Sequence, residues 1–159
     1  MTKENILAIQ AAASALAAYL SDRLGLLFPV LGLLLVAMIL DYGTGMAAAR
    51  VEALDHPGDP NFGWSSKKGA RGIAKKVGYM CVIAVAMIVD YVLLYVAAQL
   101  GIAIPTTAFF GLLVAVWYLL NELLSITENA GRMGADVPEW LSQYIAVLRD
   151  KVDNAEHKA

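Results

Sequence analysis

The chain contains four long stretches without a charged residue. The charged residues lie outside these stretches, and isolated polar residues lie within them. The stretches cover residues 5–21, 24–40, 77–89 and 91–121. An apolar helix of about 20 residues crosses a hydrocarbon core of about 30 Å. The interval between Asp90 and Glu122 is too long for one crossing, so Gln99, Gly101 and residues 105–107 mark a turn within it. The pattern predicts transmembrane helices at residues 24–49, 77–99 and 105–126, with Pro29 bending the first.

The alanine-rich segment at residues 5–21 is more ambiguous. Its 17 residues reach about 25 Å at 1.5 Å per residue, less than the hydrocarbon thickness, and alanine contributes little to insertion. It either crosses the membrane or lies on its surface, which leaves three spans with an outer N-terminus or four spans with an inner one. A weak basic region before it argues against a cleaved signal peptide.

The composition agrees with an integral membrane protein. Hydrophobic residues make up 59% of the 159-residue chain, charged residues 16%, and the mean hydropathy is +0.61. We expect an all-α membrane protein whose residues 1–159 form one domain. The net charge of −2 argues against nucleic acid as a partner. Cys81 is the only cysteine, and neither His56 nor His157 has companion ligands, so we expect no disulfide, metal or cofactor.

The connection at residues 50–76 contains the densest group of positive charges in the chain. Short basic loops remain on the cytoplasmic side, so this loop and the C-terminus are expected there. Ser65 or Ser66 is expected to cap a short basic helix, and Trp64 to lie at the headgroup level. Anionic lipid headgroups are the expected partners of the basic side chains, which are Lys67, Lys68, Arg71, Lys75 and Lys76.

Each expected span also carries polar residues on one face. Placing a carboxylate in hydrocarbon costs about 2.5–3.5 kcal/mol on the insertion scale, so these faces should contact protein or water. Helix packing and pore lining are both open for them, and the group on the last span could instead mark its inner boundary. The candidate residues for helix association or pore lining are Asp41, Thr44, Gly45, Asp90, Asn121, Glu122 and Ser125.

The segment at residues 136–152 has apolar residues at helical spacing, including Trp140, Tyr144, Ile145 and Leu148. This pattern predicts an amphipathic cytoplasmic helix. Such a helix can lie on the inner leaflet with Trp140 and Tyr144 at the interface, or pack against copies of itself.

Three motifs together resemble one phage holin family, the group of the holins of small Bacillus phages and the holin-like proteins of clostridial toxin loci. The motifs read LDYGTG at residues 40–45, SSKKGARGIAKK at residues 65–76 and NELLSITENA at residues 121–130. The resemblance covers about residues 30–141, although the loop is longer around residues 55–64 and the N-terminal segment is longer than the family requires.

The resemblance implies a protein that assembles in the bacterial cytoplasmic membrane and forms lesions through which an endolysin reaches the cell wall; some relatives export toxins instead. Self-association in lipid depends on small residues and interhelical hydrogen bonds, which the polar faces supply. The same groups could pair within one subunit or line water in an oligomer, and two such pairings would make a switch. A small ion channel or transporter is the alternative. Because no carboxylate pair or nucleophile–base pair is placed for catalysis, we expect no enzyme activity.

Overall fold

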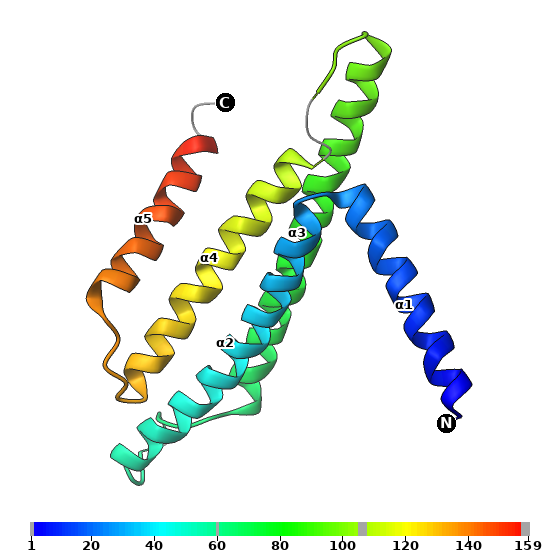
Figure 1. Ribbon diagram of the computed structural model, residues 1–159. Helices are drawn as coiled ribbons and strands as arrows, with labels where there is room; N and C mark the ends of the chain where they lie inside the picture. Colours follow the sequence, from blue (N-terminus) through cyan, green and yellow to red (C-terminus); the bar gives the residue numbers. More distant parts are fainter. Residues whose placement is uncertain (1, 60, 105–107, 157–159) are drawn as a thin grey trace.

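The computed structural model describes residues 2–59, 61–104 and 108–156, and this part of the chain contains five α-helices and no strand (Figure 1). The helices are α1 (Lys3–Leu24), α2 (Leu27–Asp55), α3 (Ser66–Gln99), α4 (Phe109–Arg132) and α5 (Glu139–Glu156). Among them α2, α3 and α4 are long and apolar enough to cross a membrane. The predicted all-α membrane fold with three spanning helices is therefore confirmed.

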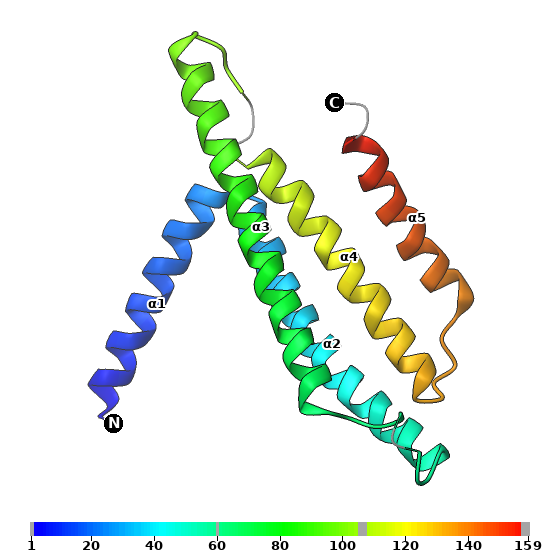
Figure 2. The same cartoon turned by 180° about the vertical axis from the view of Figure 1, so that it is seen from behind.

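Helices α2, α3 and α4 form a bundle in which α4 packs against both of the others and most extensively against α2 (Figures 1 and 2). Helices α2 and α4 run in the same direction and α3 runs opposite to them. One end of the bundle therefore holds the C-termini of α2 and α4 together with the N-terminus of α3, and we call it the basic end. Helix α3 continues well past the start of α4 at the other end (Figure 1).

The helix boundaries differ from those expected at two places. Helix α2 continues to Asp55 and α3 already begins at Ser66, so most of the expected loop at residues 50–76 is helical. The polar residues there include no helix breaker until the Pro/Gly-rich turn that follows Asp55. Ser65 caps α3 as expected, since its hydroxyl accepts the backbone N–H of Lys68 at 3.2 Å. Gly101, at φ +72°, ends the helical course after Gln99; the expected turn residues 105–107 lie outside the described residues.

Pro29 does not bend a helix in the expected way. Because α2 begins at Leu27, Pro29 lies in its first turn, where backbone N–H groups have no partner within the helix. The break comes before it, at Gly25, whose φ of +52° ends α1.

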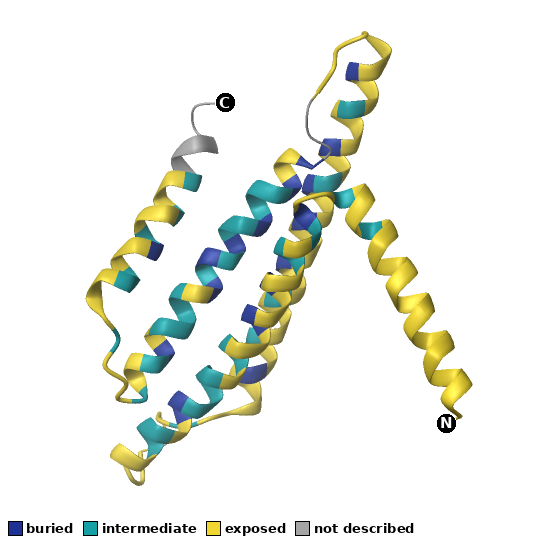
Figure 3. Cartoon of the chain, viewed as in Figure 1, coloured by how far each residue is buried: buried dark blue, intermediate teal, exposed yellow. Residues whose placement is uncertain are grey.

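Helix α1 diverges at an angle from the bundle. Its C-terminal end meets α2, and its N-terminal end lies on the same side as the basic end (Figure 1). Its 22 residues make it longer than the expected segment, and none of its described residues is buried (Figure 3). It contacts the rest of the chain through α2, next to the turn that joins them. Its side chains are therefore available to lipid or to another protein.

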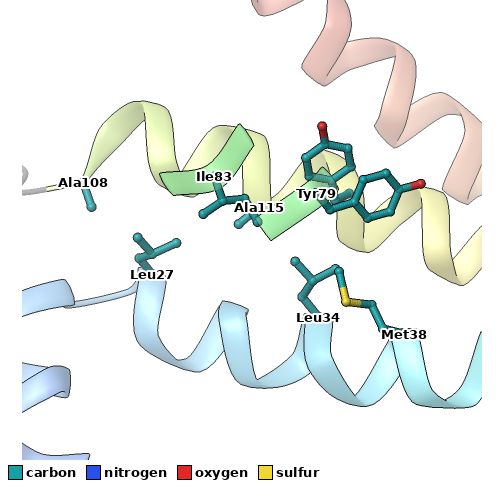
Figure 4. Close-up of a cluster of buried hydrophobic side chains, with 8 residues drawn as sticks. Leu27, Leu34, Met38, Tyr79, Ile83, Ala108 and Ala115 are labelled. Atoms are coloured by element: carbon teal, nitrogen blue, oxygen red, sulfur yellow. The ribbon is translucent and has the colours of Figure 1, made fainter. Parts of the chain in front are cut away.

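The apolar core lies where α2, α3 and α4 meet (Figure 4). Leu27, Leu34 and Ile83 are almost completely buried, and the rings of Tyr79 and Tyr118 stack with their centroids 3.9 Å apart. Outside this core, α2 and α3 expose many large apolar side chains, as helices facing lipid do. The bundle thus presents an apolar exterior around a packed centre.

Helix α5 makes a contact within the subunit that was not expected from the sequence. A short connection with Gly134 at φ +83° reverses the chain, and α5 packs antiparallel along α4 of the same molecule (Figures 1 and 2). Ile145 is buried, whereas Trp140 and Tyr144 remain 65% and 67% exposed. One part of the apolar surface of α5 therefore packs on α4, and the other part, with Trp140 and Tyr144, remains exposed.

Candidate functional site

One buried ion cluster joins the three spanning helices near the basic end. The ammonium group of Lys76 on α3 donates to Asp41 Oδ2 on α2 at 2.8 Å and to Glu122 Oε2 on α4. The side chains of Asp41, Lys76 and Glu122 are only 18%, 14% and 3% exposed. Each helix thus contributes one charge to a contact that lies inside the bundle.

Asn129 extends this cluster toward the basic end. Its Nδ2 group donates to Asp41 Oδ1 at 3.1 Å and to Thr44 Oγ1 at 3.3 Å, while Thr44 donates to the Asp41 carbonyl at 3.1 Å. Gly45 lies next to Asn129, and a Cβ at that position would make an ordinary contact of 3.5 Å with the same Nδ2. The side chain of Asp41 is therefore fixed from both α3 and α4.

The cluster contains two carboxylates and one ammonium. Removing one partner from a buried ion pair costs about 3–5 kcal/mol, because the remaining charge keeps its desolvation penalty and loses its counter-charge. Lys76 is the partner that both acids share, so the cluster depends on it most. A movement that separates α3 from α2 and α4 would remove Lys76 from both acids and incur the same kind of cost.

A second ion pair lies closer to the basic end, with Arg132 one helical turn beyond Asn129 on α4. Arg132 binds the Glu52 carboxylate with two hydrogen bonds of 2.7 and 2.8 Å and also donates to Asn129 Oδ1 at 2.9 Å. This pair is more exposed, so it contributes less stability than a buried pair of the same geometry. It holds the ends of α2 and α4 together and orients the Asn129 amide toward Asp41.

A cavity of about 260 Å³ lies beside the cluster, between α2, α4 and the start of α3. Its lining includes Asp41, Ser125 and Asn129 from the bundle and Trp64 and Lys68 from the start of α3 and the residues before it, and it is more apolar than polar overall. The cluster thus borders a mixed cavity at the basic end and apolar packing on the opposite side.

Asp90 belongs to a separate site, at the start of α4. Its carboxylate oxygens accept the backbone N–H groups of Phe110 and Gly111 at 2.9 and 2.8 Å. The first N–H groups of a helix have no partner within the helix, and Ala108 at the N-cap has no side chain that could serve them. A carboxylate from α3 supplies that cap, and it also complements the positive end of the helix dipole.

The structure brings some of the candidate residues together and separates others. Asp41, Thr44, Gly45 and Glu122 meet at the cluster and Ser125 lines the adjacent cavity, whereas Asp90 lies elsewhere. Asn121 faces α5, where its Oδ1 accepts a hydrogen bond of 3.4 Å from Arg149. The candidates therefore occupy three sites in place of one continuous face.

The expected basic residues of the loop also lie in different environments. Lys67, Lys68 and Arg71 are exposed, and Lys75 lies over the ring of Tyr79 at 5.5 Å, but Lys76 turns into the bundle. The roles of Lys76 and Asn129 in the cluster were not expected. The available signal was the spacing of Glu122, Ser125 and Asn129, which recurs at three and four residues and places them on one face of α4.

These observations define a multi-pass helical membrane protein whose spanning helices are joined by an internal ion cluster. A model of the bacteriophage holin family matches residues 18–150, and the chain belongs to that family. Family membership supports a holin-type membrane protein.

Relatives occur in several bacteria. An uncharacterized protein of Halalkalibacterium halodurans is 40% identical over 86% of this chain and 90% of its own length. One from Listeria innocua is 35% identical over 88% of this chain and 84% of its own. A 14.9 kDa protein of the nagH 3′ region in Clostridium perfringens is 34% identical over 74% and 75%. No solved structure matches the chain.

Proposed function

We propose that this holin accumulates in the bacterial cytoplasmic membrane as a subunit closed by its ion cluster and then self-associates into lesions that release an endolysin. The observation that carries the proposal is the cluster of Asp41, Lys76, Glu122 and Asn129, which pairs the charges of three spanning helices within one chain. A subunit closed in this way can reside in lipid without exposing these groups.

The basic end is proposed to face the cytoplasm. Lys67, Lys68 and Arg71 are exposed there, and positive residues flanking spans favour the cytoplasmic side. Anionic headgroups of the inner leaflet are their proposed partners. Helix α4 ends at the same side, so the connection between α4 and α5 is proposed to lie in the cytoplasm, and α5 returns from there along α4.

Assembly is proposed to exchange one set of contacts for another. Separating the helices would expose two carboxylates and one ammonium, which is favourable only where water or a neighbouring subunit replaces the internal partners. Asp41, Thr44 and Gly45 therefore contact protein in the closed subunit, and assembly is proposed to increase their exposure to water. The change couples subunit opening to formation of a water-filled lesion.

The proposal is tested by inducible expression with and without an endolysin that lacks an export signal. We expect rapid lysis only when both proteins are present, because the enzyme must pass through the lesion. Leakage of ions or a small dye without release of the enzyme would contradict the proposal and indicate a selective channel.

The role of the cluster is tested separately in the same cells. The Asp41→Asn variant should change the time at which lysis begins, whereas Asp55→Asn, at the exposed end of the same helix, should not. Unchanged timing with Asp41→Asn would reject the cluster as the element that sets assembly.

A further inference from the structure

Helix α5 covers a face of α4 on which the polar groups are only partly hydrogen-bonded. Arg149 reaches Asn121 through one hydrogen bond of 3.4 Å, at the long limit for such a bond. Two buried donors, Trp117 Nε1 and Arg149 Nε, have no hydrogen-bond partner among the described residues. Trp117 and Asn121 are four residues apart, so they lie one above the other on this face of α4. The interface thus combines apolar burial, centred on Ile145, with poorly matched polar groups.

We infer that the face of α4 carrying Trp117 and Asn121 is an association surface for the same face of a second copy of the chain, and that α5 masks it in the closed subunit. The inference rests on the proposed self-association of the protein. It specifies that α4 is the helix that associates and that α5 must first dissociate from it.

The chemistry of Asn121 suits a second copy. All copies inserted into a membrane in one orientation place the same residue at the same depth, so a two-fold axis along the membrane normal brings Asn121 opposite Asn121 of the other copy. An asparagine amide both donates and accepts, and two facing amides can therefore bond to each other. Hydrogen bonds between such side chains stabilise helix pairs in membranes. Arg149 can only donate, so it cannot offer Asn121 the same exchange.

After release from α4, α5 can bind the surface of the inner leaflet. Trp140, Tyr144 and Leu148 form an exposed apolar stripe at four-residue spacing, next to the stripe that packs on α4. After release the two stripes form one apolar face, which suits the headgroup boundary of the inner leaflet, where tryptophan and tyrosine are favoured. The lipid surface would therefore offset part of the packing that α5 loses.

Disulfide cross-linking of the full-length protein in membranes tests the inference. The reporter is Leu124→Cys, one turn from Asn121, in a Cys81→Ser background; Leu123→Cys, exposed on another side of α4, is its control. The perturbation is Ile145→Asp, which places a charge in the α4–α5 contact. Gln143→Asp, which makes a similar change at an exposed position of the same helix, is its matched control.

We expect Ile145→Asp to raise cross-linking at residue 124 severalfold, with little change at residue 123 and none with Gln143→Asp. Adding Asn121→Leu should reduce the gain. Should Ile145→Asp prevent accumulation, a chain ending at Ala135 replaces it. Equal cross-linking at residues 123 and 124, or no gain on releasing α5, would overturn the inference. Because cross-linking is read without an endolysin, this failure is distinct from a failure to lyse cells.

Discussion

Replacing Lys76 by methionine tests the ion cluster most directly. Methionine keeps most of the length and the apolar stem of lysine but has no charge, so the packing around the stem is largely retained. The carboxylates of Asp41 and Glu122 would then remain inside the bundle without a counter-charge. Glu122, with only 3% of its side chain exposed, has little access to water in compensation.

The expected loss of stability is about 3–5 kcal/mol, the usual cost of removing one partner from a buried ion pair. At 1.4 kcal/mol per factor of ten, the equilibrium shifts about a hundred- to several-thousand-fold toward separated helices. The neighbouring variant Lys75→Met removes the same charge from an exposed side chain over Tyr79, and it should cost about 0.5–1 kcal/mol. The difference between two adjacent residues is thus several kcal/mol.

Reversible SDS unfolding of the reconstituted protein, followed by tryptophan fluorescence, measures both free energies. A double variant with Glu122→Gln should recover part of the loss from Lys76→Met, which gives a coupling energy of about 0.5–3 kcal/mol for residues in direct contact. In cells that also contain the endolysin, Lys76→Met should bring lysis forward. Equal losses for the two lysine variants, or no coupling with Glu122, would refute the reasoning.

Three further expectations concern other parts of the molecule. Asp90→Ala should destabilise the protein by about 0.5–2 kcal/mol through loss of the α4 cap and accelerate hydrogen exchange of the first α4 amides; unchanged exchange would argue against the cap. Gly111→Ala should cost about 1–3 kcal/mol, because the new Cβ would lie 3.1–3.3 Å from three neighbouring atoms. Gly131→Ala, with no atom within 4 Å, should be neutral or stabilising in the same unfolding assay. The proposed orientation puts the basic end inside, and the N-terminus of α1 lies on the same side of the bundle, so Thr2→Cys in a Cys81→Ser background should resist an impermeant maleimide added to spheroplasts; ready labelling would place the N-terminus outside.

The spanning helices were predictable because their signal is large and local. A run of apolar residues long enough to cross hydrocarbon has few other uses, and the Pro/Gly-rich turn after Asp55 interrupts it clearly. The exact ends were less predictable. Polar residues that follow an apolar run can continue a helix into water, as residues 50–55 and 66–76 do.

The partners within the site were not predictable from the same information. Lys75 and Lys76 are adjacent in a basic segment, and only the rotation of α3 against α2 and α4 decides which one enters the bundle. Successive helical residues point about 100° apart, so an error of about half that angle in the rotation is enough to exchange their roles. Asp90 as a cap likewise depends on where α4 begins beside α3.

The two polar sites also define how the bundle meets a bilayer. Fourteen residues separate Lys76 from Asp90 on α3 and Leu27 from Asp41 on α2, which is about 21 Å at 1.5 Å per residue. A hydrocarbon core is about 30 Å thick, so the apolar layer between the sites is thinner than the lipid around it. Local thinning of the bilayer, or burial of one polar site within it, must compensate. Because the charged groups at both sites have hydrogen-bond partners within the chain, the closed subunit tolerates this mismatch. Once the helices separate, the same charges lie at the depth of lipid without partners, and only water or another subunit can replace them. The short apolar layer therefore links opening of the bundle to assembly.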